Sequence, residues 1–172
     1  MLNRPVIDGY EFAAARSRLS GVWPIGDFAR LGSLLSSHAG AVEYTLEGAP
    51  DTQDRSALHL RIRGALQLRC QRCLTPLELP LQIDAVLVLA RSEAEIGALP
   101  AEAAGPDWVV ATKAMQVHEL LEDELLLAVP YAPRHERCAA QAKAASGASV
   151  SPFASLRGML KAPATDARSK RS

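Results

Sequence analysis

The sequence predicts an α+β fold in which an antiparallel β-sheet, a meander or a partial barrel, packs with N-terminal helices and one acidic C-terminal helix. Three observations support this fold class. Residues 41–91 alternate apolar and polar side chains, residues 112–130 repeat apolar side chains at helical spacing, and residues 139–151 are low-complexity Ala, Ser and Gly. The predicted organisation is therefore one domain at 1–138, a flexible linker at 139–150, and a short amphipathic helix with a basic tail at 151–172.

The N-terminal part of the chain predicts two short amphipathic helices, at residues 10–21 and 27–40, each with one apolar side against the sheet. Leu19 continues the helical spacing of the first, and Gly21 suits a left-handed turn at its end. Asp27 is a suitable N-cap for the second.

Three strands are predicted next. Residues 41–48 alternate, and residues 58–70 show the clearest pattern of the chain, with leucines, Ile62 and Cys70 on one parity and basic or polar residues on the other. Gly64 falls on the apolar parity, where it marks either a bend in one long strand or a turn between two short strands. Residues 76–91 alternate first and then become apolar on both parities, as in a strand covered on both faces.

The remaining elements follow a change in composition. Residues 92–106 lack a period and predict an acidic loop, and residues 107–110 predict a short strand. Residues 112–130 predict a strong helix with Thr112 as its cap. Pro130 and Pro133 end it. The carboxylates expected on its exposed side are Glu119, Glu122 and Asp123.

Composition narrows the class of protein. The N-terminus has no uninterrupted apolar run of the kind found in secretory signals, and charge interrupts the longer apolar stretches elsewhere. We therefore expect a cytoplasmic protein without a membrane partner, whose thiols stay reduced. Three cysteines in such a chain favour metal binding, redox chemistry or packing over a disulfide framework.

The net charge of zero conceals a segregation of charge. Residues 92–130 carry eight acidic and one basic side chain, whereas residues 131–172 carry eight basic and two acidic ones. An acidic helix and loop beside a solubilising basic tail is the simple interpretation, and segregated surfaces for partners of opposite charge are the functional one.

All three cysteines lie in two short motifs, "CQRC" at 70–73 and "HERC" at 135–138. Cys70, Cys73, His135 and Cys138 offer the four sulfur and nitrogen donors that a structural zinc takes. Two simpler interpretations stay open: Cys70 as a core thiol, and His135 with Cys138 as solvated linker residues. A thioredoxin-like redox site is the third, although the CxxC follows a strand and precedes another strand rather than a helix.

Two further groups of residues suit binding partners. Arg61, Arg63 and Arg69 on one strand face, with Arg72 in the adjacent turn, form a candidate track for RNA phosphates. An ordinary solvated sheet face is the commoner explanation for such arginines, and no aromatic side chain is interleaved for base stacking. The C-terminal candidate is a docking peptide with apolar residues at helical spacing, for which a frayed tail is the alternative: Phe153, Leu156 and Leu160.

Motifs of phosphate-binding loops, dinucleotide-binding turns, serine hydrolases and zinc proteases are absent from the sequence. We therefore expect neither an enzyme nor a small-molecule substrate.

The order of the motifs carries a family resemblance. "LRCQRCLTPLELPL", an acidic loop, "ELLEDELLLAVPYAPRHERC" and a terminal "SPFASLRGMLK" together resemble the YceD-like family, the large ribosomal RNA subunit accumulation proteins of bacteria and plastids. The resemblance spans about residues 41–138 and the C-terminal peptide. The matching positions are Cys70, Arg72 and Cys73 in the first motif, and Glu122, Glu124, Pro130, Pro133, His135 and Cys138 in the second.

The resemblance implies a non-enzymatic factor that supports synthesis, processing or stability of 23S ribosomal RNA and so biogenesis of the large subunit. Its partner is then 23S RNA or a large-subunit precursor, reached directly or through a ribosomal protein. Some relatives carry additional cysteines after the second proline, which favours a metal site, whereas this chain keeps one and offers three thiolates and a histidine. The alternative is a zinc-clipped adaptor that binds a ribosomal protein or an RNA-processing enzyme.

Overall fold

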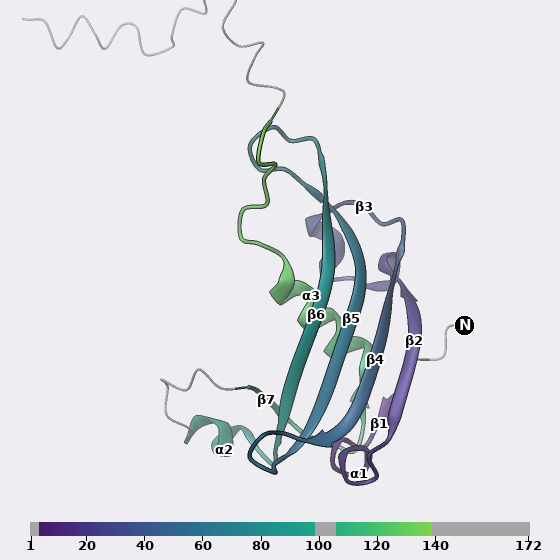
Figure 1. Ribbon diagram of the computed structural model, residues 1–172, viewed down its shortest axis with the longest axis vertical. Helices are drawn as coiled ribbons and strands as arrows, with labels where there is room; N and C mark the ends of the chain where they lie inside the picture. The colour runs from purple at the N-terminus through teal and green to yellow at the C-terminus, as the bar shows by residue number, and fades with distance from the viewer. Residues whose placement is uncertain (1–3, 99–105, 139–172) are drawn as a thin grey trace, which may run out of the picture. The chain divides into compact units, whose positions relative to one another are not determined.

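The computed structural model describes residues 4–98 and 106–138 (Figure 1). Short strands, 3₁₀ turns and a helix precede a sheet of long strands, and the longest helix comes last. The elements are β1 (Val6–Ile7), α1 (Gly9–Ala14), β2 (Arg18–Pro24), η1 (Ile25–Asp27), η2 (Leu31–Leu34), β3 (Leu35–Ser37), β4 (Ala41–Pro50), β5 (Ser56–Arg69), β6 (Pro76–Ala90), α2 (Glu93–Gly97), β7 (Asp107–Val110), β8 (Met115–Gln116) and α3 (Val117–Ala128).

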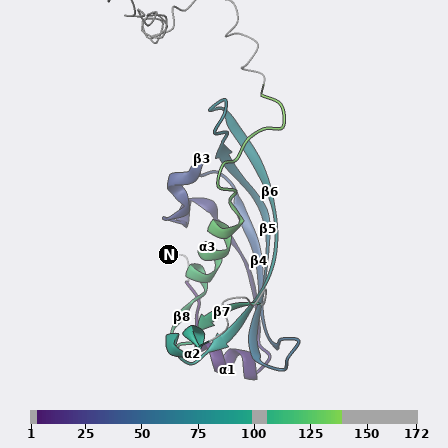
Figure 2. The same ribbon diagram turned by 90° about the vertical axis from the view of Figure 1, so that its left-hand side faces the viewer.

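The main sheet has the strand order β2-β4-β5-β6-β7, with β3 paired to β5 beside this path. All neighbours run antiparallel except β6 and β7, which are parallel, and β1 with β8 forms a separate two-stranded ribbon. The sheet is strongly curved, and α3, η2 and α1 lie on its concave side (Figure 2). No described element covers the convex side. The predicted α+β class is confirmed, with one parallel pair that strand patterning alone does not reveal.

The strand predictions for β5 and β6 are confirmed. The apolar parity of β5, from Leu58 to Leu68, is buried, while Arg61, Arg63 and Arg69 are exposed. Gly64 lies within one continuous strand. A Cβ there would approach Val42 Cγ1 at 3.0 Å, and at this point the neighbour of β5 changes from β4 to β3, so glycine allows the close approach.

The prediction of two N-terminal helices is largely wrong. Helix α1 ends at Ala14, and Leu19 and Gly21 instead lie in β2, where they pair with Leu46 and Tyr44 of β4. Asp27 caps no α-helix and belongs to the 3₁₀ turn η1. Hydrogen bonding to β4 outweighs the weak helical spacing of this segment.

Two smaller predictions also differ from the structure. The acidic loop predicted at 92–106 contains α2, whose cap Ser92 accepts a hydrogen bond from the backbone N–H of Glu95. Thr112 does not cap α3, because β8 comes between them and Gln116 holds the N-cap position without a side-chain hydrogen bond.

Helix α3 fills the concave side of the sheet. Val117, Leu121 and Leu125 are fully buried in a core shared with β4, β5 and β6. Glu119 and Asp123 are exposed as expected, but Glu122 is only 4% exposed, which corrects the prediction that it faces solvent. The helix ends at Ala128, before Pro130. No helix of the described residues is long and apolar enough to cross a membrane.

Candidate metal centre

The turn between β5 and β6 holds the first two cysteines. The backbone N–H of Leu74 donates to the carbonyl of Cys70 at 2.9 Å, and the N–H of Cys70 donates to the carbonyl of Thr75 at 3.0 Å. These bonds fold the turn tightly, and Leu74 takes a left-handed conformation with φ of 61°. Cys70 is fully buried at the end of β5, while Cys73 is half-buried in the turn.

The segment that follows α3 returns to this turn. The N–H of Gln71 donates to the carbonyl of Pro133 at 2.8 Å, which fixes the segment against the hairpin. The ring Nε2 of His135 lies 3.1 Å from the carbonyl of Pro76 at the start of β6. Pro130 and Pro133 therefore lead the chain out of α3 in a path that brings His135 and Cys138 beside the CxxC.

The structure brings together all four donors predicted from the sequence. The ligand atoms of Cys70, Cys73, His135 and Cys138 lie within 4.8 Å of one another, close enough to hold one metal ion. Cys70 Sγ and Cys138 Sγ are 3.7 Å apart, and Cys73 Sγ and His135 Nδ1 are 3.4 Å apart.

These two distances fit the edges of a tetrahedron. Sulfurs bound at about 2.3 Å to one zinc ion in tetrahedral geometry lie about 3.8 Å apart, and a nitrogen lies slightly closer. The three-sulfur, one-nitrogen donor set is also one of the common structural zinc sets. His135 donates its Nε2–H to the carbonyl of Pro76, which leaves Nδ1 as the ligand atom.

The electrostatics of the cluster favour thiolates at two positions. Burial raises the pKa of the Cys70 thiol, but hydrogen bonds from backbone N–H groups, first that of Cys73, bring this pKa down to about 5. A hydrogen bond from the Thr75 hydroxyl lowers the pKa of Cys73. Metal binding requires deprotonated thiols, so the local environment prepares Cys70 and Cys73 as ligands.

Cys138 differs from the other two thiols. The hydrogen bond from Arg72 lowers the pKa of Cys138, but burial and the neighbouring thiols outweigh it, so this pKa lies above its ordinary value. The same hydrogen bond raises the pKa of Arg72. Cys138 is thus the thiol of the cluster whose pKa is raised.

Arg72 belongs to this cluster and not to the strand face. Its Nε donates to Cys138 Sγ at 3.0 Å, and its terminal nitrogen donates to the carbonyls of His135 and Glu136 at 3.3 and 3.5 Å. Three thiolates with one Zn²⁺ carry a charge of −1, which a neighbouring guanidinium balances. The side chain therefore joins the turn to the segment after α3 through polar contacts of its own.

The arginines of β5 lie on the uncovered convex face among carboxylates. Arg61 lies 3.8 Å from Glu47 of β4 and 3.6 Å from Asp84 of β6, and Arg63 faces Glu43 across the strands. These pairs are partly exposed, and alternation of sign along the face is what a solvated sheet shows. The structure thus separates Arg61, Arg63 and Arg69 from Arg72.

The docking residues Phe153, Leu156 and Leu160, the linker at 139–150 and the tail all lie outside the described residues. Their predicted roles stay predictions.

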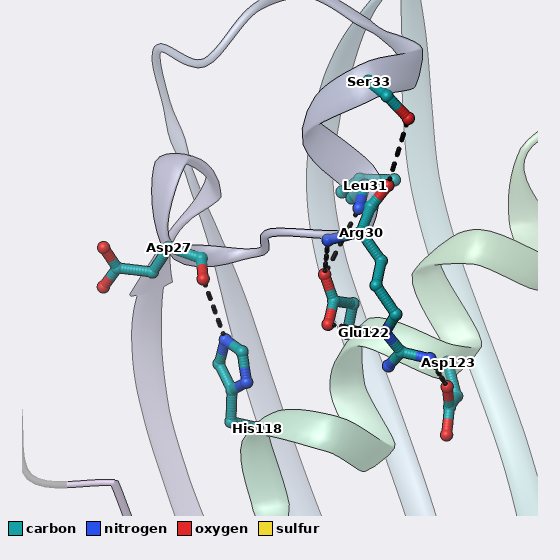
Figure 3. A network of polar contacts seen from close by, with 7 residues as sticks. All are labelled: Asp27, Arg30, Leu31, Ser33, His118, Glu122 and Asp123. Atoms are coloured by element: carbon teal, nitrogen blue, oxygen red, sulfur yellow. Dashed lines mark hydrogen bonds and ion pairs between the residues drawn. The ribbon is translucent and has the colours of Figure 1, made fainter.

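Sequence reasoning missed a second polar cluster, between α3 and the N-terminal segment (Figure 3). The carboxylate of Glu122 accepts hydrogen bonds from the backbone N–H of Arg30 at 2.6 Å, from Arg30 Nε at 2.9 Å and from the N–H of Leu31 at 3.2 Å. Asp123 accepts from the same guanidinium at 2.6 Å. His118 lies 3.2 Å from the carbonyl of Asp27 and stacks on Phe28. In the sequence, the local signal for this cluster is that Glu122 and Asp123 lie beside the apolar positions of α3.

Comparison with known proteins identifies the family to which the chain belongs. The family model of the large ribosomal RNA subunit accumulation protein YceD matches residues 58–159, more than half of the chain. The matched range begins in β5 and includes the four clustered donors, Arg72 and α3. No curated protein and no solved structure matches the chain. The chain therefore belongs to the YceD family of large ribosomal RNA subunit accumulation proteins.

Proposed function

We propose that the protein is a non-enzymatic, cytoplasmic factor that supports synthesis, processing or stability of 23S ribosomal RNA and so assembly of the large ribosomal subunit. The family match over residues 58–159 carries this proposal. The matched range contains the folded elements that build the cysteine cluster, so the resemblance extends over the part of the chain with the most distinctive chemistry. Its partner is 23S RNA or a large-subunit precursor.

The proposal includes one structural zinc held by Cys70, Cys73, His135 and Cys138. Zinc here would act as a cross-link without chemistry of its own, because all four tetrahedral positions are filled by protein donors. It would join the β5–β6 turn to the segment after α3, parts of the chain that the hydrogen bond from Gln71 to Pro133 already holds together. The donor spacing described above supports this assignment.

The zinc assignment is tested by metal content. Purified wild-type protein is expected to contain about one zinc per chain, and Cys70→Ser is expected to lose it. The matched control is Ser37→Ala, a small substitution in β3 outside the four donors, which keeps the metal. A wild-type protein purified without chelators that carries no zinc and takes up none on addition would refute the assignment.

The cellular role is tested by removing the protein. A deletion strain is expected to show a lower ratio of 23S to 16S RNA and fewer large subunits in sucrose gradients, both restored by the wild-type gene. Complementation with Cys70→Ser then shows whether the proposed zinc site is needed for 23S RNA accumulation. Unchanged RNA ratios and subunit profiles in the deletion strain would refute the proposed function, whatever the metal content.

Within this proposal, the residues that contact RNA are Arg61, Arg63 and Arg69 on the convex face. Substituting all three by glutamine is expected to weaken binding of a 23S fragment and to reduce its salt dependence, since each lost phosphate contact lowers the slope by about one. If the triple variant and the wild type bind the RNA with the same affinity at every salt concentration, the convex face does not contact RNA and this part of the proposal is refuted.

The alternative is an adaptor that binds a ribosomal protein or a processing enzyme, with its effect on RNA secondary. The acidic character of residues 92–130 favours it, because such a segment repels phosphate and attracts basic proteins. Ultraviolet crosslinking in cells distinguishes the two. Recovered RNA supports direct contact, whereas recovered protein without RNA supports the adaptor.

A further inference from the structure

A groove of about 490 Å³ lies along β6, away from the cysteine cluster. It runs between the β4–β5 turn at Asp51, residues 83–86 of β6, the start of β7 at Asp107, and Glu124 of α3. Strand β7 pairs only with Leu87–Ala90, so among the described residues the earlier part of β6 has no strand beside it opposite β5. Figure 1 shows β7 beside the lower end of β6 only.

Glu124 is the unusual residue of this groove. Its side chain is buried, with 8% of its surface exposed, and it has neither a hydrogen bond nor an ion pair with any described residue. Burial raises the pKa of its carboxyl, and the charges of Asp107 and Asp123 raise it further. Among the described residues, the Glu124 oxygens are not sealed from solvent, so they reach the groove, and a cation that joined them there would offset the cost of burying the carboxylate.

The neighbouring carboxylates indicate where such a cation would bind. Asp51 is already bound by Arg55, and Asp84 lies 3.6 Å from Arg61. Asp107 is exposed, lines the same groove and forms no ion pair with the described residues. Glu124 and Asp107 are thus two like charges near each other. One positive group between them would offset their repulsion and give the Glu124 carboxylate a partner.

The remaining lining of the groove favours a long side chain over a bare ion. Ile83 and Ala85, which share one face of β6, form with Pro106 an apolar wall beside the carboxylates. Lysine and arginine carry an aliphatic stem that packs against such a wall while the charged head reaches a carboxylate. Phosphate is excluded from this groove by the same carboxylates.

We propose that this groove binds a lysine or arginine side chain of a basic partner protein, whose head group lies between Glu124 and Asp107. The stem contacts the apolar wall at Ile83 and Ala85. The site is separate from the zinc cluster and from the arginines of β5. It deepens the adaptor alternative, because it names the residues that a basic partner would contact, and it does not depend on direct contact with RNA.

A defined peptide tests the proposal. The probe is a fluorescein-labelled peptide of alternating lysine and valine, compared with one in which glutamine replaces lysine, and binding is followed by fluorescence anisotropy at low and moderate salt. The full-length wild-type protein is expected to bind the lysine peptide and not the glutamine peptide. The double variant Glu124→Gln with Asp107→Asn is expected to bind at least about tenfold more weakly.

The matched control is Glu119→Gln, which removes the same charge from an exposed position of α3 that does not line the groove. It is expected to change affinity by less than about twofold. Equal loss in Glu119→Gln and in the double variant would show attraction to general negative charge and overturn the proposal. Equal affinity of the wild-type protein and the double variant for the lysine peptide would overturn the proposal as well.

One competing occupant and one folding control are tested with the same proteins. Calcium titration by calorimetry that shows binding lost in the double variant, together with displacement of the peptide, would assign the groove to a metal ion and overturn the proposal. Thermal unfolding excludes misfolding as a cause, because Glu124→Gln removes a buried charge and is expected to melt at or above the wild-type temperature at neutral pH. A melting temperature well below wild type would show that Glu124 has a stabilising partner and would also overturn the proposal.

Discussion

Glu122 shows how one side chain decides the position of a segment. Its carboxylate accepts two backbone N–H groups and one guanidinium N–H, and the two backbone donors lie 91 and 92 positions earlier in the chain. Those backbone donors belong to a segment of 3₁₀ turns that forms few regular hydrogen bonds itself. The carboxylate therefore supplies the acceptors that this segment would otherwise lack.

Replacing Glu122 by glutamine is expected to lower the free energy of unfolding by about 2 kcal/mol at neutral pH, because charge-assisted hydrogen bonds to a buried group are lost. Urea unfolding measures this. The exposed Glu119→Gln is the control and is expected to change the free energy by less than about 0.5 kcal/mol.

The effect of Glu122 also depends on pH. Burial raises its pKa, but the hydrogen bonds from Arg30 and Leu31 outweigh burial, so the pKa lies below the ordinary 4.5. A lowered pKa in the folded state means that the stabilisation is present above the unfolded pKa and is lost as pH falls through the folded one. The difference between wild type and Glu122→Gln should therefore shrink as pH falls below about 4.5; a constant difference would contradict the role of its charge.

Leu74 combines backbone strain with exposure. Its φ of 61° lies in the left-handed region, and 66% of its side chain surface is exposed at the turn that carries the CxxC. The left-handed conformation costs a residue with a Cβ about 1 kcal/mol, and glycine avoids this cost.

Leu74→Gly is therefore expected to exceed Leu74→Ala in unfolding free energy by about 1 kcal/mol, measured by urea unfolding of the two variants. The alanine variant is the matched control, because both changes remove the leucine side chain and only one removes the Cβ. An alanine variant as stable as the glycine variant would show that the turn carries no strain at this residue.

The residues of the cluster and Glu122 differ in how far sequence could place them. The cysteines stand out because thiols are few and their spacing suits a metal, and the structure brings the four predicted donors within 4.8 Å of one another. From the sequence, Glu122 is expected to face solvent because it lies beside charged residues in the helical pattern. Its partner Arg30 lies in a segment whose path no local pattern reveals. Contacts of this kind depend on the completed tertiary structure.

At the scale of elements, β4, β5, β6 and α3 follow from the sequence, whereas the segment before β4 does not. Each of these elements is long and has one buried and one exposed face over most of its length, so its period appears clearly in the sequence, and the last four residues of β6 are buried on both faces. Strand β2 has polar and small residues at many positions and is held by pairing with β4. Its strand character comes from that partner, which a local window does not contain.

Helix α1 packs against β4 at Gly48. The backbone N–H of Gly48 donates to the carbonyl of Ser17 at 2.8 Å, and a Cβ at Gly48 would lie 2.7 Å from the Cα of Ala13. Backbone atoms of α1 occupy the space that any side chain would need.

Gly48→Ala is therefore expected to displace α1 and to lower the free energy of unfolding by about 2 to 3 kcal/mol, measured by thermal and urea unfolding. Gly97→Ala in α2 is the matched control. Apart from its chain neighbours and its own helix backbone, no atom of the described residues lies within 4 Å of a Cβ at Gly97, so that variant is expected to be neutral or slightly more stable. Similar losses in both variants would contradict the close approach of α1 to β4.

At the scale of the whole described molecule, the cysteine cluster joins segments far apart in the chain. Cys73 and His135 are 62 positions apart, and the loop between them contains β6, β7 and α3. A metal bound by both ends closes this loop and reduces the conformational freedom of the unfolded chain, which by loop-closure reasoning is worth about 4 kcal/mol.

Chelation of zinc is therefore expected to lower the melting temperature by roughly 10 °C and to increase amide exchange in residues 71–75 and 133–138. Differential scanning fluorimetry and hydrogen exchange with and without chelator measure these effects. Cys70→Ser, already without the metal, should not respond to the chelator. A wild-type melting curve that is the same with and without chelator would contradict a structural metal.

The same separation of donors has a consequence for the order of events while the chain is being made. Synthesis delivers "CQRC" first, and the 62 positions up to His135 still have to follow. The β5–β6 hairpin closes through contacts that are local in sequence, whereas the second pair of donors reaches it only after α3 has been made and docked. The proposed zinc site would therefore close late, on a molecule whose sheet and helix are already in place.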